Sequence, residues 1–253
     1  MLLPFLGLRL SHVALDGADE ALFDELYALY ATSHAIDREA FEAKTRRKFT
    51  HLAILRDRTG CLVGFVGARA RRVTLADGRS VSTVMVGQAM VAPAHRRGPV
   101  AVLGPLLLVG RQWLAGAGER VYMWHDCITV RTFLLVARGT DRYYPHPRHA
   151  TPDDVQAVLD AVGTETYGPA YCAETHVVRK GTRLVCEGDI PEHRLQDEVT
   201  AFYADRNPGY VRGDGLLQVV PVDLSVLVDT VRTLLRRTRR AATVVGSRAR
   251  SAA

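Results

Sequence analysis

The sequence predicts an α/β fold of the α+β kind, in which a mixed, mostly antiparallel central sheet is flanked by helices and carries a C-terminal extension. Three observations support this prediction. Two helical stretches come first, and strands joined by short Gly- and Asp-bearing turns follow them. A strand–loop–helix unit and a strand–helix unit come next, and a strongly apolar strand lies near the C-terminal end. The 253 residues, 47% of them hydrophobic, suit one large domain or one domain with an insertion.

The first half of the chain alternates helical and extended patterns. The apolar Met1–Leu10 is interpreted as a first strand or docking segment, because it has neither a basic start nor a cleavage site. Apolar residues at helical spacing predict a helix over Asp19–Ser33, and a second helix of mixed charge is predicted near Arg38–Lys48. The strands predicted next are His51–Leu55, Leu62–Ala68, Arg71–Leu75 and Ser80–Val91, with turns at Arg56–Gly60 and Ala76–Gly78.

The second half is expected to contain more helix than strand. A helix should end near Leu114, and Val121–Trp124 should form a short strand before a helix over Ile128–Arg138. The elements predicted after Thr151 are a helix to about Val162, a hairpin of Thr175–Val178 with Arg183–Cys186, a helix over Arg194–Asp205, and the strand Gly215–Val222.

Composition excludes several classes of protein. The four cysteines are scattered without a C-x-x-C pair, which argues against structural zinc or a redox dithiol and favours free thiols in a reducing cytoplasm. His146 and His149 lack acidic or Cys companions at ligand spacing, so no metal is expected. No apolar run approaches the roughly 20 residues of a membrane span. The net charge of +6 favours acidic partners, although much of the excess lies near the C-terminal end.

The most informative segment joins a strand to a helix. The apolar strand ending at Val91 runs into a Pro/Gly turn that carries Arg96, Arg97 and Gly98, and an apolar helical stretch follows directly. Free amides and the positive end of a helix dipole make such a turn a cradle for anions, and two arginines add donors suited to phosphate. A Walker lysine and a complete G-x-G-x-x-G are both absent. The alternative is a basic surface loop without a ligand.

The strand Met85–Val91, the turn Val91-Ala-Pro93 and the segment Arg96-x-x-Pro99-x-Ala101 resemble motif A of the GNAT acyltransferases. In that family a Gln/Arg-x-x-Gly-x-Gly/Ala loop holds the pyrophosphate of acetyl-coenzyme A. Pro99 departs from the pattern, because it stands at a glycine position when Arg96 is aligned with the family's arginine. The order of elements over roughly residues 9–147 is also that of a GNAT domain.

The resemblance implies an N-acyltransferase that moves an acetyl or longer acyl group from acyl-coenzyme A to an amine, without a metal. Backbone amides of Met90, Val91 and Ala92 would orient the thioester. The loop residues expected to hold the pyrophosphate are Arg96, Arg97, Gly98, Val100 and Ala101.

Candidate acid–base groups follow the next strand. His125 is a plausible base, Asp126 would orient it or bind an amine, and Cys127 is a candidate nucleophile. The alternative has Asp126 capping the helix that begins at Ile128, with His125 hydrogen-bonded in the wall and Cys127 buried.

A tyrosine in the following helix donates a proton to coenzyme A in many GNAT proteins. Ile128–Arg138 contains none, so Tyr143 and Tyr144 are the nearest substitutes, unless they form a half-buried aromatic pair in a strand. Gln88 is predicted to be either a substrate contact or a satisfied polar group.

The chain is predicted to divide into a GNAT-like acyl-CoA-binding core (1–150), an insertion and sheet-completing extension of the same domain (151–225), and a basic C-terminal helix and tail (226–253). The tail is expected to be a packed helix with a frayed basic end, or else an amphipathic helix on an anionic membrane, a nucleic-acid arm or a partner-docking helix.

Two other functions remain open from the sequence. One is a non-catalytic acyl-CoA sensor or scaffold, and the other is an N-acyl amino acid synthase-like enzyme that uses long acyl chains. The expected partners are a small-molecule or protein amine, with an acyl carrier protein or an anionic membrane surface for the basic tail. Nucleic acid is the least favoured partner.

Overall fold

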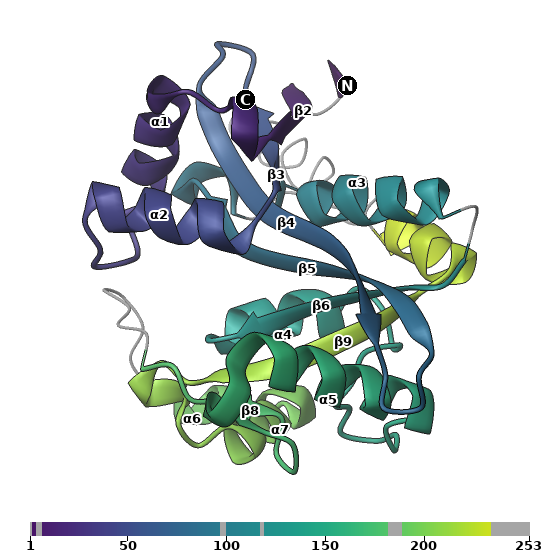
Figure 1. Ribbon diagram of the computed structural model, residues 1–253. Helices are drawn as coiled ribbons and strands as arrows, with labels where there is room; N and C mark the ends of the chain where they lie inside the picture. Colours follow the sequence, from purple (N-terminus) through teal and green to yellow (C-terminus); the bar gives the residue numbers. More distant parts are fainter. Residues whose placement is uncertain (1, 4–6, 97–99, 117–118, 182–188, 234–253) are drawn as a thin grey trace, which may run out of the picture.

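The protein is described by a computed structural model that covers residues 2–3, 7–96, 100–116, 119–181 and 189–233. Nine strands form one sheet in the order β1-β2-β3-β4-β5-β6-β9-β8-β7 (Figure 1). Among the described strands, every neighbouring pair is antiparallel except β5 and β6, which run parallel. The predicted fold class, a mixed and mostly antiparallel sheet flanked by helices, is confirmed.

The strands are β1 (Leu2–Leu3), β2 (Leu8–Ala14), β3 (His51–Arg56), β4 (Leu62–Thr74), β5 (Ser80–Val91), β6 (Val121–Cys127), β7 (Tyr171–Cys172), β8 (Val177–Val178) and β9 (Gly215–Val222). The helices are α1 (Glu20–Tyr30), α2 (Arg38–Lys48), α3 (Val100–Ala115), α4 (Val130–Ala137), α5 (Asp153–Tyr167), α6 (Glu192–Leu195) and α7 (Glu198–Arg206), and residues 224–233 are also helical.

Two details of the sheet differ from the sequence-based expectation. The segments Leu62–Ala68 and Arg71–Leu75 were expected as separate strands, but β4 is continuous, because Arg69 and Ala70 pair with Met85 and Val84 of β5. The hairpin expected between Thr175–Val178 and Arg183–Cys186 is also wrong for its first strand. Residues of β8 pair with β7 and β9, whereas 183–186 lie outside the described residues.

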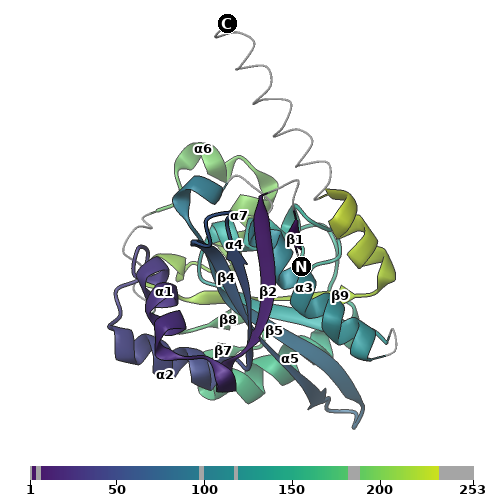
Figure 2. The same ribbon diagram turned by 90° about the horizontal axis from the view of Figure 1, so that it is seen from above.

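Alternating side chains give the sheet a core on each face. On β3, Ala53 and Leu55 face the core that contains residues of α3, α4 and α7. Leu52 and Ile54 face the opposite core, which contains residues of α1, α2 and α5. The sheet thus separates the helix group α3, α4 and α7 from the helix group α1, α2 and α5 (Figure 2).

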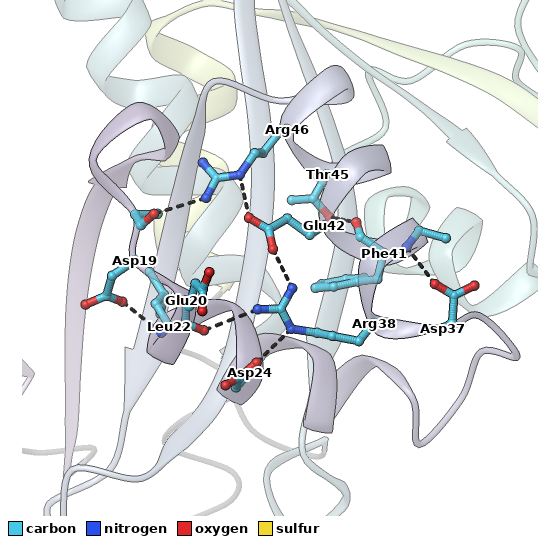
Figure 3. Close-up of polar contacts among 12 residues, drawn as sticks. Asp19, Glu20, Leu22, Asp24, Asp37, Arg38, Phe41, Glu42, Thr45 and Arg46 are labelled. Atoms are coloured by element: carbon cyan, nitrogen blue, oxygen red, sulfur yellow. Dashed lines mark hydrogen bonds and ion pairs between the residues drawn. The ribbon is translucent and has the colours of Figure 1, made fainter.

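α2 is held against α1 by charged side chains, as Figure 3 shows. The Arg38 guanidinium donates to Asp24 at 2.7 Å and also pairs with Glu42, and Arg46 donates to Glu42 at 2.7 Å. Arg46 also donates to the Leu15 carbonyl at 2.6 Å. Because α2 begins at the cap residue Asp37 and is clamped along its length, the side chains at its C-terminal end have a defined position.

The C-terminal part of the chain returns to the sheet. β9 pairs with the whole of β6, from Val121 opposite Val222 to Cys127 opposite Leu216. Beyond it, Val226 and Leu227 of the helix at 224–233 pack against the core on the α3 and α4 face. Residues 234–253 of the basic tail lie outside the described residues. No helix in the described part of the chain has both the length and the apolar character needed to span a membrane.

Candidate active site

The one parallel strand pair of the described sheet separates toward its carboxyl ends. β5 and β6 pair from Ser82 opposite Val121 to Met85 opposite Trp124, and their pairing stops there. We call the two unpaired ends, Val86–Val91 and His125–Cys127, the strand fork. Backbone polar groups on the facing edges of a fork are not used by the sheet, so they remain available to a ligand.

A β-bulge marks the β5 side of the fork. Phe65 lies opposite Met90 and Gly67 opposite Gly87, so Val66 alone lies opposite both Gln88 and Ala89. Gln88 has a φ of 49°, in the left-handed region that non-glycine residues seldom adopt. Its side chain accepts a hydrogen bond at 3.0 Å from Thr45 on α2. Gln88 therefore connects the fork to α2; its role as a substrate contact remains a prediction.

The three amides predicted to orient a thioester do not all face the fork. Ala92 N–H donates to the Val63 carbonyl at 2.9 Å, so it is already used in pairing with β4. The N–H groups of successive residues point to opposite sides of a strand. The Met90 amide therefore also faces β4, and the Val91 amide faces away from it. The Val91 carbonyl accepts instead from Arg96 at 3.1 Å. Of the three, Val91 presents its amide to the fork.

The predicted pyrophosphate loop is described only at its two ends. Arg96 is exposed and follows the short turn Pro93–His95. Ala101 lies in the first turn of α3 and is half-buried. Arg97 and Gly98 lie outside the described residues, as does the side chain of Val100. The helix thus begins where the resemblance requires it.

The predicted trio His125, Asp126 and Cys127 is divided between the two faces of the sheet. His125 Nε2 lies 2.7 Å from Gln218 Oε1, and burial lowers the pKa of His125 to about 4. Cys127 has no exposed surface, and burial raises the pKa of its thiol well above the ordinary value. A neutral, enclosed imidazole and a protonated thiol match the alternative in which His125 is hydrogen-bonded in the wall and Cys127 is buried. They disfavour a thiolate nucleophile.

Tyr143 and Tyr144 lie beyond β9, away from the fork. Tyr144 bridges to Val219, with N–H to carbonyl distances of 2.9 and 2.8 Å in the two directions. Tyr143 is 1% exposed and packs edge-on against Phe133, and burial raises its pKa to about 12. One strand therefore separates both tyrosines from β6, so the half-buried aromatic alternative describes their position better than contact with a donor in the fork.

Asp126 points to the opposite face from His125, where it joins three residues that the sequence analysis missed. Tyr167 at the end of α5 donates to Asp126 Oδ2 at 2.6 Å. Lys48, the last residue of α2, has its Nζ 3.5 Å from the same oxygen, and Lys180 also pairs with it. Asp126 does not cap the next helix, because the side chain of Thr129 does so. The capping alternative for Asp126 is therefore wrong.

Each lysine is held by its own element. Lys48 is fixed by the clamped helix α2, whereas Lys180 follows β8 in a turn whose backbone is bound by a buried carboxylate. The Lys180 amide donates to Asp214 Oδ1 at 3.0 Å, and the Gly181 amide donates to the same oxygen at 3.4 Å. The Lys180 ammonium also lies 5.3 Å from the ring centre of Tyr167.

Burial and neighbouring positive charge weaken the protonated forms of these lysines. Burial, with the charge of Arg47, lowers the pKa of Lys48 to about 8. Burial also lowers the pKa of Lys180, and the charges of Lys48 and Lys44 add to that effect. Burial lowers the pKa of Lys44 as well. Amines that lose their proton this readily are suited to accept one near neutral pH.

The sequence held only a weak sign of this cluster. Lys48 appears there as one of three basic residues ending a helix, and Lys180 as part of a Lys-Gly turn; both patterns are common on surfaces. Within the described residues, no group of three His, Cys, Asp or Glu side chains is placed to hold a metal ion. Separately, an apolar cavity of about 100 Å³ lies on the other face, between α3, α4 and the helix at 224–233.

Comparisons with known proteins concern only part of the chain. No family model matches the sequence, and no curated protein does so either. Among solved structures, a GCN5-related N-acetyltransferase from Kribbella flavida matches with 16% identity and a TM-score of 0.39, over 55% of this chain and 33% of that chain. A probable N-acyltransferase from Enterococcus faecalis V583 matches with 12% identity and a TM-score of 0.37, over 54% and 32%. N-myristoyltransferase of Saccharomyces cerevisiae, with bound myristoyl-CoA, matches with 13% identity and a TM-score of 0.35, over 47% and 29%.

This chain thus spans about a third or less of each of these three proteins. Such distant and partial likenesses do not extend to substrate or mechanism. The order of elements and the strand fork agree with the arrangement that the motif A resemblance led us to expect.

Proposed function

We propose that this protein is an N-acyltransferase that transfers an acyl group from acyl-coenzyme A to an amine. The observation that carries the proposal is the end of β5–β6 pairing at Met85 and Trp124, which leaves the Val91 amide facing the fork on the strand that precedes α3. An amide in that position can donate to a thioester carbonyl, and the start of α3 with Arg96 can hold a diphosphate.

In this proposal the donor and the acceptor reach the fork from opposite faces of the sheet. The diphosphate would lie at the start of α3, which packs on one face, and the amine would approach from the face that carries α2 and Asp126. The Asp126 carboxylate is suited to hold an ammonium ion before it reacts. The motif A resemblance supports the first half of this arrangement, and the cluster around Asp126 supports the second.

The reaction needs one proton acceptor on the protein. The amine nitrogen forms a bond to the thioester carbon, the carbon–sulfur bond breaks, and the thiolate of coenzyme A takes a proton from solvent. Lys48, whose pKa of about 8 lets it accept a proton near neutral pH, takes one proton from the bound ammonium before attack, and the nitrogen releases its second proton to solvent as the carbon–sulfur bond breaks. Lys48 thereby replaces His125 as the proposed base, since His125 lies on the other face.

The first test is ligand binding. Coenzyme A and acetyl-coenzyme A should raise the unfolding temperature of the full chain, whereas ATP and NAD should not. Thiol release with a panel of amines then tests catalysis. Binding without thiol release from any amine would refute the enzyme and leave the acyl-CoA sensor as the function.

A substitution tests the role assigned to the backbone. Val91→Pro removes the amide that faces the fork and leaves the Ala92 bond to β4 in place. We expect acetyl-coenzyme A affinity to fall by about tenfold, the usual cost of one hydrogen bond of this kind, with little change in the unliganded unfolding temperature. Unchanged affinity in a folded Val91→Pro protein would place the donor elsewhere.

A further inference from the structure

The residues around Asp126 carry more positive charge than that carboxylate can balance. Lys48 and Lys180 both pair with Asp126, and Lys44 lies one helical turn before Lys48 on α2. Within the described part of the chain, no ion pair involves Lys44, and no second carboxylate pairs with Lys48 or Lys180. We call Lys44, Lys48 and Lys180 the lysine cluster. Two lysines thus share one carboxylate, and a third lies close enough to Lys180 for its charge to act on it.

An uncompensated cluster of this kind is costly unless something else binds it. The side chains of Lys48 and Lys180 are 24% and 18% exposed, and that of Asp126 is 10% exposed. Buried ammonium groups without partners lose their hydration, so a purely structural network would be expected to match its charges. The surplus here is of the sign that attracts a small anion.

The cluster is also held in place independently of any ligand. α2 is fixed to α1 by the Arg38–Asp24 ion pair and to the preceding turn by Arg46, which donates to the carbonyls of Leu15 and Ala18 (Figure 3). The turn that carries Lys180 is bound through its backbone by Asp214, which is 8% exposed. A site whose cations are fixed before binding loses little conformational entropy when an anion arrives.

The position of the cluster identifies which part of a ligand it would meet. Asp126 lies on β6 within the fork and pairs with Lys48, and Lys44 lies one turn of α2 before Lys48. The carboxylate and the unpaired positive charge are therefore neighbours. A molecule with an ammonium group and an anionic group close together matches both. The ammonium would displace a lysine from Asp126, and the freed lysine would bind the anion.

We propose that the acceptor of the transferase is an amine that also carries an anionic group, either a carboxylate, as in an amino acid, or a phosphate. This proposal rests on the proposed function for the reaction but not for the binding. Lys44 and Lys180 would hold the anion while Asp126 orients the amine toward the fork and Lys48 stays free to accept its proton. Neutral amines of the same size would then be poor acceptors, because they leave the surplus charge unbalanced.

The experiment compares each acceptor with its uncharged counterpart. Thiol release from acetyl-coenzyme A is measured with the common amino acids, each beside its own amide, and with O-phosphoethanolamine beside ethanolamine. We expect kcat/KM to be at least about tenfold higher for one class of anionic amine, as one lost charge-assisted contact predicts. Equal rates for all the pairs would overturn the proposal, and preference for the phosphate would identify that anion.

Variants connect any preference to these residues. Lys180→Met should abolish the discrimination between acid and amide, and Lys44→Met should reduce it without touching an ion pair, so that it tests the idea even where Lys180→Met does not fold. Arg47→Met is the matched control, because it removes an exposed positive charge from the same turn of α2. A preference that survives both cluster variants would overturn the assignment.

Equilibrium binding separates this proposal from the proposed function. Isothermal titration of the amino acids, of O-phosphoethanolamine and of the amide controls into the protein without donor does not depend on turnover. One outcome is that no amine releases thiol, yet an anionic amine binds and its binding is lost in Lys180→Met or Lys44→Met. That outcome would support the anion site and refute the transferase. If acetyl-coenzyme A binds and neutral amines alone are acylated, the transferase stands and the anion site fails.

Discussion

Asp126→Asn tests whether one buried carboxylate neutralises the lysine cluster. The substitution keeps the size of the side chain and an oxygen for the Tyr167 hydroxyl, but it removes the charge that faces Lys48 and Lys180. Removing one partner of a buried ion pair usually costs about 3–5 kcal/mol, because the other partner stays buried and uncompensated. Because the lowered pKa of Lys48 makes its proton easy to lose, we expect a smaller loss of unfolding free energy, about 1–3 kcal/mol at pH 7.

The lysines themselves set an upper limit to the loss. Lys48, whose pKa is about 8, can escape an unfavourable charge by releasing its proton, at a cost of about 1.4 kcal/mol at pH 7 and at no cost at pH 9. The destabilisation by Asp126→Asn should therefore shrink as the pH rises. In the unmodified protein, the folded pKa of Lys48, about 8, lies below that of an unfolded lysine, so stability should rise with pH from about 8 towards that ordinary value.

The measurement is urea unfolding followed by tryptophan fluorescence at pH 7 and pH 9, since Trp124 lies 6.5 Å from Tyr167 between ring centres. Asp154→Asn is the matched control, because Asp154 also accepts from a tyrosine and an arginine but is 35% exposed. Its loss should stay below about 1 kcal/mol. A similarly small loss for Asp126→Asn at pH 7 would refute the argument, since solvent would then be screening the lysines.

Two further predictions concern packing and acid stability. A Cβ at Gly104 of α3 would lie 2.4 Å from Val66 Cγ1, so Gly104→Ala should lower stability by about 1–3 kcal/mol, whereas Gly110→Ala in the same helix meets nothing within 4 Å and should raise it by up to about 1 kcal/mol. Equal thermal shifts for the two variants would contradict the close approach of α3 to β4. Burial lowers the pKa of His125 to about 4, so the unfolded chain binds its proton first, and up to about 3 kcal/mol of stability should be lost as pH falls from about 6.5 to 4. His125→Asn should flatten that part of the urea-midpoint profile in proportion, and an unchanged slope would show that the imidazole is solvated.

Periodicity in the sequence was sufficient for most elements of the fold. The helical stripe after Asp19, the alternation in Ser80–Val91 and the apolar run Gly215–Val222 each correspond to an element of the structure. The hydrophobic effect acts on such local patterns, so they can be recognised without the tertiary structure. The break expected between Ala68 and Arg71 failed because charged residues also occupy the exposed positions of a long strand.

The candidate site could be predicted from the sequence only where its residues are contiguous. The motif around Arg96 is contiguous, and a contiguous motif can be recognised in one dimension. Lys48, Tyr167 and Lys180 are separated by up to 132 residues from one another, and none has an unusual local context. Only the pairing of β6 with β9 and the docking of α2 and α5 on one face bring them to Asp126.

By itself, the sequence determined the kind of sheet, the order of the helices around it and the strand–turn–helix segment suited to a diphosphate, because each of these depends on neighbouring residues. The tertiary structure decided which groups face the strand fork. The side of β5 that an amide faces depends on its partner strand, and the face of β6 that a side chain joins depends on register. That is why Val91 and Asp126 are the groups proposed for the reaction, while His125 and Cys127 are buried on the other face and Tyr143 and Tyr144 lie beyond β9.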